Sequence, residues 1–501
     1  MTQTVTVGTF GMTRADVVAV AREDARVALS DEALVAMAVA RAHVERLAVA
    51  AEPVYGISTG FGALAQRHIP VADRVQLQRS LVRSHAAGWG DPVEPEVVRA
   101  MMLLRLKTLA SGRTGARPVV AETMAALLNA GITPVVREFG SLGCSGDLAP
   151  LASCALVLMG EGEVLGPDGT AVPAAPMLAQ HGIAPVELHE KEGLALINGT
   201  DGMLGMLILA IEDLSHLCDV ADIGAAMSVE GLLGTDSVFR AELHEPLRPH
   251  PGQILSSARM LHHLAGSPIV ASHLESDDRV QDAYSLRCAP QVTGGLRDTV
   301  THATLVADRE LAAAIDNPVV LDDGSVSSNG NFHGAPVAYV LDFLAIPAAD
   351  VASMAERRTD RMLDVKRSHG LPPFLAEDPG VDSGLMIAHY TQAGLVSDCK
   401  RLAAPASVDS IPSSAMQEDH VSMGWHAARK LRSIVDNLTA VLGIELMTAA
   451  RAIELRQPLT PSPRSRAVVD ALRETVPGPG QDRYLAPEVE AAARFVRAMP
   501  A

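Results

Sequence analysis

Aromatic side chains are scarce in this chain of 501 residues: phenylalanine, tyrosine and tryptophan together make up 3% of it. Strand-rich sandwiches and barrels rely on aromatic and β-branched residues, so this scarcity disfavours them. Hydrophobic residues still make up 48% of the chain, which is enough for a large core. With its many alanines and leucines, the composition predicts a mainly α protein built from packed helices.

Cysteine is rare as well. The five cysteines are odd in number, widely spaced and free of CxxC pairs: Cys144, Cys154, Cys218, Cys288 and Cys399. This pattern argues against a disulfide framework and against a zinc site, and we expect no metal.

Further absences concern membranes and nucleic acids. The chain does not open with a basic and then an apolar segment, so no secretory signal is expected. The longest apolar run, residues 203–211, is far shorter than the roughly 18 residues that cross a bilayer. The formal net charge of −18 argues against nucleic acid or an anionic membrane as the partner. We therefore expect a cytoplasmic protein, and the net charge itself does not indicate whether the partner is a small molecule.

What the chain does contain is a glycine-rich stretch, residues 139–151, with the sequence FGSLGCSGDLAPL. The Gly146 nitrogen has no side chain beside it, so it can approach the Cys144 carbonyl carbon and close a five-membered ring. Loss of water and then of the Ser145 hydroxyl would leave a methylidene conjugated to a carbonyl, which is a strong electrophile. Asp147 could assist the proton transfers. The alternative is an ordinary loop in which Ser145 or Asp147 caps the next helix.

Other polar residues stand out along the chain. Tyr55 begins a glycine-rich segment, residues 55–62, which is either a connector or a lid that brings a phenol to a substrate. His85 lies inside or at the end of a predicted helix, and Asn198 lies in a turn before one. Each of these two residues has a structural role as its alternative.

Gln281, Tyr284 and Arg287 are spaced by three, which puts them on one face if the segment is helical. An amide, a phenol and a guanidinium on one face suit the binding of a carboxylate. An ordinary salt bridge of Arg287 is the alternative.

The stretch GSLGCSGDLAPLA resembles the signature of the aromatic amino-acid ammonia-lyase family. Members of that family form a methylidene-imidazolone (MIO) group from an inner tripeptide, most often Ala-Ser-Gly. Cys144 departs from that form, but ring closure uses only its backbone carbonyl. Further matches follow in order along nearly the whole chain: residues 55–62, 84–88, 192–200, 280–287, 316–318, 330–334 and 417–420.

The resemblance implies an MIO group formed from Cys144, Ser145 and Gly146, with no external cofactor. It also implies Tyr55 as the base for the β-proton and Arg287 as the ligand of the carboxylate. The remaining residues that it places around the prosthetic group and the substrate are His85, Asn198, Gln281, Tyr284, Phe332 and Glu418. Of these, Tyr284 and Glu418 join Tyr55 and Ser145 in the implied catalytic set.

The chain resembles the histidine branch of the family most, because of Ser84-His85 and of Glu418, where other branches tend to have glutamine. A carboxylate accepts the N–H of an imidazole better than an amide does. Asp201 and Met416 stand where many histidine enzymes carry glutamine and asparagine. The implied reaction converts L-histidine into urocanate and ammonia. The alternatives are a tyrosine or phenylalanine ammonia-lyase, a 2,3-aminomutase, or a helical assembly protein without catalysis.

Long helical patterns dominate the second half, at residues 296–315, 336–363 and 419–456. In the last of these, apolar residues recur at helical spacing over a length that one subunit cannot readily cover. The resemblance implies a homotetramer with active sites shared between subunits. We expect residues 1–200 to carry the tyrosine loop and the MIO-forming loop. Residues 201–501 would form the long-helix bundle and a helical tail, within one continuous globular unit.

Overall fold

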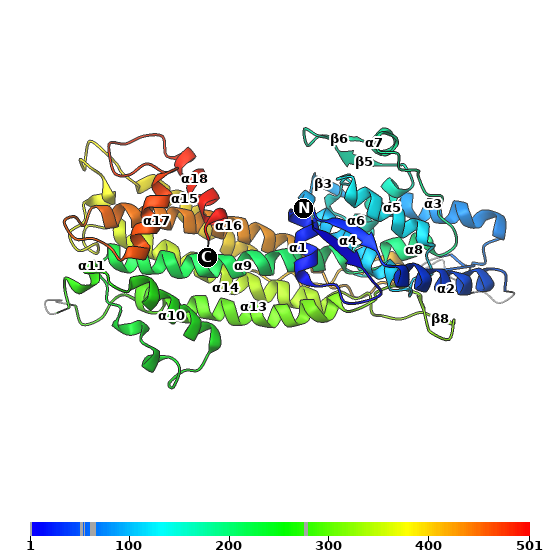
Figure 1. Cartoon of the computed structure of the whole chain (residues 1–501), viewed down its shortest axis with the longest axis horizontal. Helices are drawn as coiled ribbons and strands as arrows, with labels where there is room; N and C mark the ends of the chain where they lie inside the picture. Colours follow the sequence, from blue (N-terminus) through cyan, green and yellow to red (C-terminus); the bar gives the residue numbers. More distant parts are fainter. Residues whose placement is uncertain (1–2, 51–53, 55, 61–66, 275–278, 501) are drawn as a thin grey trace. The chain divides into compact units, whose positions relative to one another are not determined.

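The computed structural model describes residues 3–50, 54, 56–60, 67–274 and 279–500. The protein is mainly helical, as its composition predicts, and the strands in these ranges form two-stranded pairs (Figure 1). Two compact units make up the chain. The first consists of residues 1–209, 304–341 and 405–429, and the second of residues 210–303, 342–404 and 430–501. Two segments of the first unit thus come from beyond residue 200, in the part that the sequence assigned to the helix bundle.

The first unit begins with two short parallel strands, β1 (Thr4–Val7) and β2 (Arg26–Leu29), with α1 (Arg14–Arg22) between them. Thr13 caps α1, since its hydroxyl accepts from the Asp16 amide and the Asp16 carboxylate accepts from the Thr13 amide. β2 separates α1 from the next helix of the chain. The helical pattern resumes at α2 (Asp31–Ala48).

α4 (Pro95–Ala110) is the central helix of the first unit, and residues 97–110 are buried without exception. α1, α2, α5 (Pro118–Asn129) and α6 (Leu148–Leu158) pack against it. α3 (Arg74–His85) and α8 (Glu192–Ile197) pack in turn against α6. The glycine-rich stretch therefore leads directly into a core helix.

Short antiparallel strand pairs connect these helices. β3 (Trp89–Pro92) pairs with β4 (Arg137–Phe139), which ends where the glycine-rich stretch begins. The remaining strands and the short helix of this unit are β5 (Glu163–Leu165), β6 (Ala171–Pro173), α7 (Ala174–Gln180), β7 (Val319–Val320) and β8 (Val326–Ser327). The pairing of β3 with β4 fixes the start of the stretch that carries Cys144.

Four long helices contribute residues to both units: α9 (Asp201–Gly231), α13 (Ala289–Leu311), α14 (Ala335–Leu363) and α16 (Gly424–Glu454). In the second unit, Gly231 of α9 lies against Ala452 of α16 and Met362 of α14. Arg297 of α13 forms an ion pair with Asp219 of α9 at 2.6 Å. The shorter helices of this unit are α10 (Pro251–Leu264), α11 (Pro268–Ala271), α12 (Tyr284–Arg287), α15 (Met386–Leu402), α17 (Pro463–Arg473) and α18 (Ala486–Ala498).

The predicted long helices are confirmed, with shifted ends. α14 keeps Pro347 inside the helix, and α13 begins earlier than predicted. α16 begins at Gly424 rather than at residue 419, because Met423 has a φ of +56°, which is incompatible with a right-handed helix. The segment that carries Glu418 therefore precedes the helix instead of forming its first turn.

α14 and α16 are each long and apolar enough to cross a bilayer by length and composition. Most of the apolar window is buried inside the protein in both helices, 61% in α14 and 78% in α16. Burial of that extent is typical of core helices, which pass the same test of length and composition.

Candidate active site

A cavity of about 550 Å³ in the first unit collects polar side chains from separate parts of the chain. His85 comes from the end of α3, Ser145 from the glycine-rich stretch, Asn198 from the end of α8, and Glu418 from the segment before α16. Arg67, Ser80, Ser84 and Ser414 also line it, and the apolar part of the wall consists of Ile69, Leu77, Leu81, Leu148, Leu194 and Ile197. A mostly apolar cavity with a few convergent polar groups is typical of a small-molecule site.

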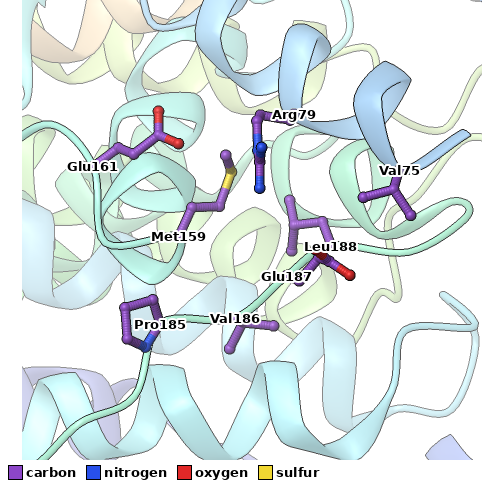
Figure 2. A pocket seen from close by; sticks show the side chains of 8 residues that line it. All are labelled: Val75, Arg79, Met159, Glu161, Pro185, Val186, Glu187 and Leu188. Atoms are coloured by element: carbon purple, nitrogen blue, oxygen red, sulfur yellow. The ribbon is translucent and has the colours of Figure 1, made fainter. Parts of the chain in front are cut away.

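A smaller cavity of about 180 Å³ lies elsewhere in the first unit. Figure 2 shows its lining side chains, which come from α3, from the residues after α6 and from the segment 185–188. Arg83 binds the Glu161 carboxylate there through Nε at 2.7 Å and Nη2 at 2.8 Å. None of the predicted site residues lines this cavity, so the larger one is the candidate site.

The backbone of Gly146 lies against the backbone of Gly199. Gly146 has a φ of +79°, and a Cβ atom placed on it would overlap the Gly199 carbonyl group. The next amide, that of Asp147, donates to the Gly199 oxygen at 2.8 Å. Only glycine combines this backbone angle with so close an approach, so residue 146 must lack a side chain.

The other side of the glycine-rich stretch is held by the residues just before α16. The Ser422 hydroxyl donates to the Gly143 carbonyl at 3.0 Å, and the Met423 amide donates to the Leu142 carbonyl at 2.9 Å. The stretch is thus fixed from two sides by segments that are distant in sequence.

Asp147, two residues after Ser145 in the chain, is fully buried. Its Oδ1 accepts from the Ser141 hydroxyl at 2.8 Å, and its Oδ2 accepts from the Met203 amide at 2.9 Å. Burial raises the pKa of this carboxyl to about 7, against the opposing effect of the two hydrogen bonds. Asp147 occupies the N-cap position of α6 but makes no capping hydrogen bond with its side chain. A carboxyl with such a pKa can take up and release protons near neutral pH.

The Cys144 side chain is buried and packs with Val421 and Met423. Burial raises the pKa of its thiol to about 12, and the charge of Glu418 acts in the same direction. The side chain is therefore a neutral thiol at physiological pH and not a nucleophile.

His85 is the last residue of α3, and its Nδ1 lies 2.9 Å from the carbonyl oxygen of Leu81. A carbonyl only accepts hydrogen bonds, so Nδ1 carries the proton in this arrangement. In the neutral ring, Nε2 then holds the lone pair. His85 therefore offers the cavity a hydrogen-bond acceptor.

Asn198 is buried and is fixed by its side-chain nitrogen, which donates to Leu194 O at 3.2 Å and to Asn317 O at 3.3 Å. Asn317 also lines the cavity. Asn317 belongs to one of the matched motifs, at residues 316–318, but no site role was expected for it.

Glu418 is held at the base of a tight loop. Ser413 and Glu418 exchange two backbone hydrogen bonds, at 3.0 and 3.3 Å, around three residues with positive φ: Ser414, Ala415 and Met416. The Ser413 hydroxyl donates to Glu418 Oε2 at 3.0 Å. Left-handed angles at residues other than glycine are costly and need support from their surroundings. The sequence did not single out Ser413, which fixes the Glu418 carboxylate.

Gln281, Tyr284 and Arg287 belong to the second unit and are not among the described residues that line the cavity. The condition for one helical face is met only for Tyr284 and Arg287, because α12 begins at Tyr284 and Gln281 lies outside it. The Arg287 guanidinium lies over the Tyr284 ring, 4.6 Å from its centroid, and its Nε donates to Asp282 O at 3.0 Å.

Two predicted residues remain. Tyr55 lies outside the described residues. Phe332 lies in the segment that joins β8 to α14. It is half-buried and does not line the cavity. In the described ranges, no group of three or more His, Cys, Asp or Glu side chains is arranged to hold a metal ion.

Known proteins match nearly the whole length of this chain. A family model described as "Aromatic amino acid lyase" matches residues 12–474. The histidine ammonia-lyase of Streptomyces avermitilis is 68% identical over 495 residues, which cover 99% of this chain and 96% of that protein. The histidine ammonia-lyase of Gloeobacter violaceus is 49% identical over 476 residues, which cover 95% of this chain and 92% of that protein.

Solved structures agree with these matches. A tyrosine aminomutase from Streptomyces globisporus superimposes with a TM-score of 0.92 at 38% identity, covering 99% of this chain and 97% of that one. Histidine ammonia-lyase from Trypanosoma cruzi does so with a TM-score of 0.90 at 36% identity, covering 99% and 94%. With the fold, the cavity and the sequence in agreement over nearly its full length, the chain belongs to the aromatic amino acid lyase family and is a lyase.

Proposed function

We propose that this protein removes ammonia from L-histidine without oxidation, to give urocanate, and that it uses an electrophile formed from Cys144, Ser145 and Gly146. The observation that carries the proposal is the position of Ser145 in one cavity with His85 and Glu418. Both side chains present acceptors that suit the N–H groups of an imidazole. The names of the relatives from Streptomyces avermitilis and Gloeobacter violaceus support the same substrate.

The residues around Ser145 fit an MIO group. The approach of Gly199 leaves no room for a side chain at position 146, while Ser145 itself faces the cavity. Among the described residues, no carbonyl accepts a hydrogen bond from the Gly146 amide, so its nitrogen is available for ring closure. The buried Asp147 carboxyl, with its pKa near 7, lies next to that nitrogen in the chain and can move protons during ring closure.

When formed, the MIO group supplies an electrophile that withdraws electron density and so makes departure of the amino group possible. We propose that Tyr55 removes the β-proton of the substrate. Asn198, held by the carbonyls of Leu194 and Asn317, would position the substrate beside Ser145.

The imidazole ring of the substrate would lie between His85 and Glu418. Since Nδ1 of His85 donates to Leu81 O, its Nε2 accepts, and the Glu418 carboxylate accepts as well. A ring with two N–H donors satisfies both acceptors, so the site favours an imidazolium over a phenyl or phenol ring.

We further propose a cytoplasmic homotetramer with active sites shared between subunits. In it, the cavity of one subunit is completed by Gln281, Tyr284 and Arg287 of the partner subunit. Support comes from α14, where Tyr339, Phe343 and Ile346 are 45%, 48% and 52% exposed. Their spacing of four and three puts them on one face of the helix, and exposed apolar faces of this kind mark interaction surfaces.

The test is to incubate the purified protein with L-histidine and to follow urocanate and ammonia. The mass of the peptide that contains residues 144–146 is measured in parallel, and we expect it to lack two waters. Ser145→Ala should fold and assemble but should keep the full peptide mass and lose nearly all activity. Normal turnover by a pure Ser145→Ala protein would contradict the proposal.

A 2,3-aminomutase is the second candidate, because a tyrosine aminomutase shares the fold at a TM-score of 0.92. The same incubation separates the two activities when it is repeated with tyrosine and phenylalanine and the products are resolved by chromatography. Formation of a β-amino acid in place of an unsaturated acid would favour the aminomutase.

A further inference from the structure

Directly behind Gly199 lies a buried ion pair between Arg105 of α4 and Asp201 at the start of α9. The side chains are 1% and 7% exposed. Arg105 Nε donates to Asp201 Oδ2 at 3.0 Å, and Nη1 donates to the Ala195 carbonyl at 3.0 Å. The Ile315 carbonyl lies 3.4 Å from both Nη1 and Nη2. The flat guanidinium group is therefore fixed in position by side-chain and backbone acceptors from three segments.

Gly199 is packed between this ion pair and Gly146. A Cβ atom placed on Gly199 would overlap Arg105 Nη2 and would also meet Asp201 Oδ2. On the other side, a Cβ atom placed on Gly146 would overlap the Gly199 carbonyl and would lie 2.7 Å from the Gly199 nitrogen. The guanidinium, the Gly199 peptide and the Gly146 peptide thus form three layers in contact.

We propose that the Arg105–Asp201 ion pair positions Gly199 as a rigid wall that holds Gly146 in place for ring closure onto Cys144. This inference rests on the proposed function, because it requires that the ring forms. Arg105 and Asp201 are positioning residues here, since they act through Gly199 and do not touch the reacting atoms.

Ring closure at Cys144, Ser145 and Gly146 needs no other reactant, because the chain itself supplies all the atoms of the two waters that leave. The Gly146 nitrogen bonds to the Cys144 carbonyl carbon, and the carbonyl oxygen leaves as water with the hydrogens of the Gly146 and Ser145 amides. The Ser145 hydroxyl then leaves as a second water with the Ser145 α-hydrogen. Neither step transfers electrons to another molecule. Holding the Gly146 nitrogen close to the Cys144 carbonyl carbon speeds formation of the first bond.

Stability alone does not explain the ion pair. Burying two charges costs desolvation, and a buried ion pair often stabilises a fold no more than apolar residues of similar volume. The flat Arg105 guanidinium, held by carbonyl groups, does however provide a rigid surface behind Gly199, which has no side chain of its own. The structure therefore favours a role in positioning over a role in stability.

The experiment follows ring closure itself rather than activity. The full chain is synthesised in a cell-free system and stopped at fixed times, and the fraction of the 144–146 peptide that lacks two waters is measured. In Arg105→Lys, the charge remains but the flat group behind Gly199 is lost, and we expect ring closure to slow by roughly tenfold or more. Asp201→Asn keeps the shape of the acceptor, and we expect a smaller delay.

The matched control is Arg358→Lys, which changes a buried ion pair in the second unit. Arg358 and Glu445 are 2% and 0% exposed, and Arg358 Nη2 donates to Glu445 Oε2 at 3.0 Å. We expect Arg358→Lys to lower the thermal midpoint while the rate of ring closure stays at the parental value.

The rates of ring closure in the three variants distinguish positioning from general stability. A delay in Arg105→Lys or Asp201→Asn, with a normal rate in Arg358→Lys, supports the inference. The inference is overturned if Arg105→Lys and Asp201→Asn both fold and close the ring at the parental rate. It is also overturned if Arg358→Lys delays ring closure equally. If the parent protein itself never loses two waters, the proposed function fails, which distinguishes that failure from the failure of this inference. Should Arg105→Lys not fold, Asp201→Asn carries the test.

Discussion

The hydroxyl of Ser413 donates a hydrogen bond of 3.0 Å to Oε2 of Glu418, across a loop in which three of the four intervening residues have left-handed backbone angles. This bond and the two backbone bonds between the same residues fix the Glu418 carboxylate at the wall of the cavity. Left-handed angles cost of order 1 kcal/mol each at residues other than glycine, and such strain is often retained at functional sites. The position of the Glu418 carboxylate is therefore fixed by hydrogen bonds of its side chain and of its backbone.

We expect Glu418→Gln to lower kcat/KM for histidine by roughly ten- to a hundredfold, because a charge-assisted hydrogen bond contributes about 1.5–3 kcal/mol. Values for tyrosine and phenylalanine should change much less. The measurement is steady-state kinetics with all three substrates at equal concentrations of folded protein. The outcome against our assignment is an unchanged value for histidine.

Ser413→Ala is the partner of that experiment. It removes the hydroxyl that orients the carboxylate but keeps the charge and the two backbone hydrogen bonds of the loop, so we expect a smaller loss of kcat/KM, about fivefold. A loss as large as that of Glu418→Gln would mean that orientation and not charge is the main contribution of Glu418.

Asp147 should make the stability of the protein fall as pH rises from about 4 to about 7. Burial raises the pKa of this carboxyl to about 7 in the folded state, so the folded protein binds the proton more tightly than the unfolded chain does. Between the two pKa values, each pH unit then costs about 1.4 kcal/mol of unfolding free energy from this group. Asp147→Asn removes the titration and should remove this slope.

The measurement is chemical denaturation of Ser145→Ala and of Ser145→Ala/Asp147→Asn at several pH values, which avoids any effect of ring closure. We expect Ser145→Ala/Asp147→Asn to gain unfolding free energy relative to Ser145→Ala as pH rises. The difference between the two proteins should become constant above about pH 7. A difference that is constant over this range would refute the assignment.

Cys144→Ala should keep both ring closure and activity, because the ring uses only the backbone carbonyl of residue 144. The thiol packs with Val421 and Met423, so its removal should lower the unfolding free energy by about 1 kcal/mol. Because burial raises the pKa of the thiol to about 12, thiol reagents should also leave the parent active at neutral pH. Peptide mass, kcat and denaturation curves check these expectations. Loss of the two-water deficit in Cys144→Ala would show that the side chain takes part.

Phe343→Asp on the exposed face of α14 should dissociate the proposed tetramer and abolish activity together. A charge in an apolar interface is desolvated without a partner, and dissociation would remove the Arg287 of the partner subunit from the cavity. Sedimentation velocity and kcat/KM are measured on the same samples. Phe10→Asp is the matched control, because Phe10 is 80% exposed and lies outside that face. A fully active monomer of Phe343→Asp would show that the site is complete within one subunit.

Local features of this protein could be predicted from its sequence alone. The cap at Thr13, the end of α3 at His85 and the bounds of α14 follow from residue types and spacing within a few turns. The ring-forming chemistry of Cys144 to Gly146 also depends only on neighbouring backbone atoms.

The tertiary structure decided what depends on partners far away in the sequence. β2 forms a strand because residues 4–7 lie beside it, and a helical pattern cannot reveal such a partner. Gln281 falls outside α12 where the Asp282 carboxylate accepts from the Thr235 amide at 2.8 Å, which holds that segment in an irregular conformation.

The same distinction applies to the site. The sequence predicted His85, Ser145, Asn198 and Glu418 separately, and the fold placed them around one cavity. That Gly146 rests on Gly199, and Gly199 on Arg105, was decided by the packing of α4 and α9 against the glycine-rich stretch. Close packing has no local signature, because a glycine that leaves room for another backbone looks the same in a sequence as a glycine in an open loop.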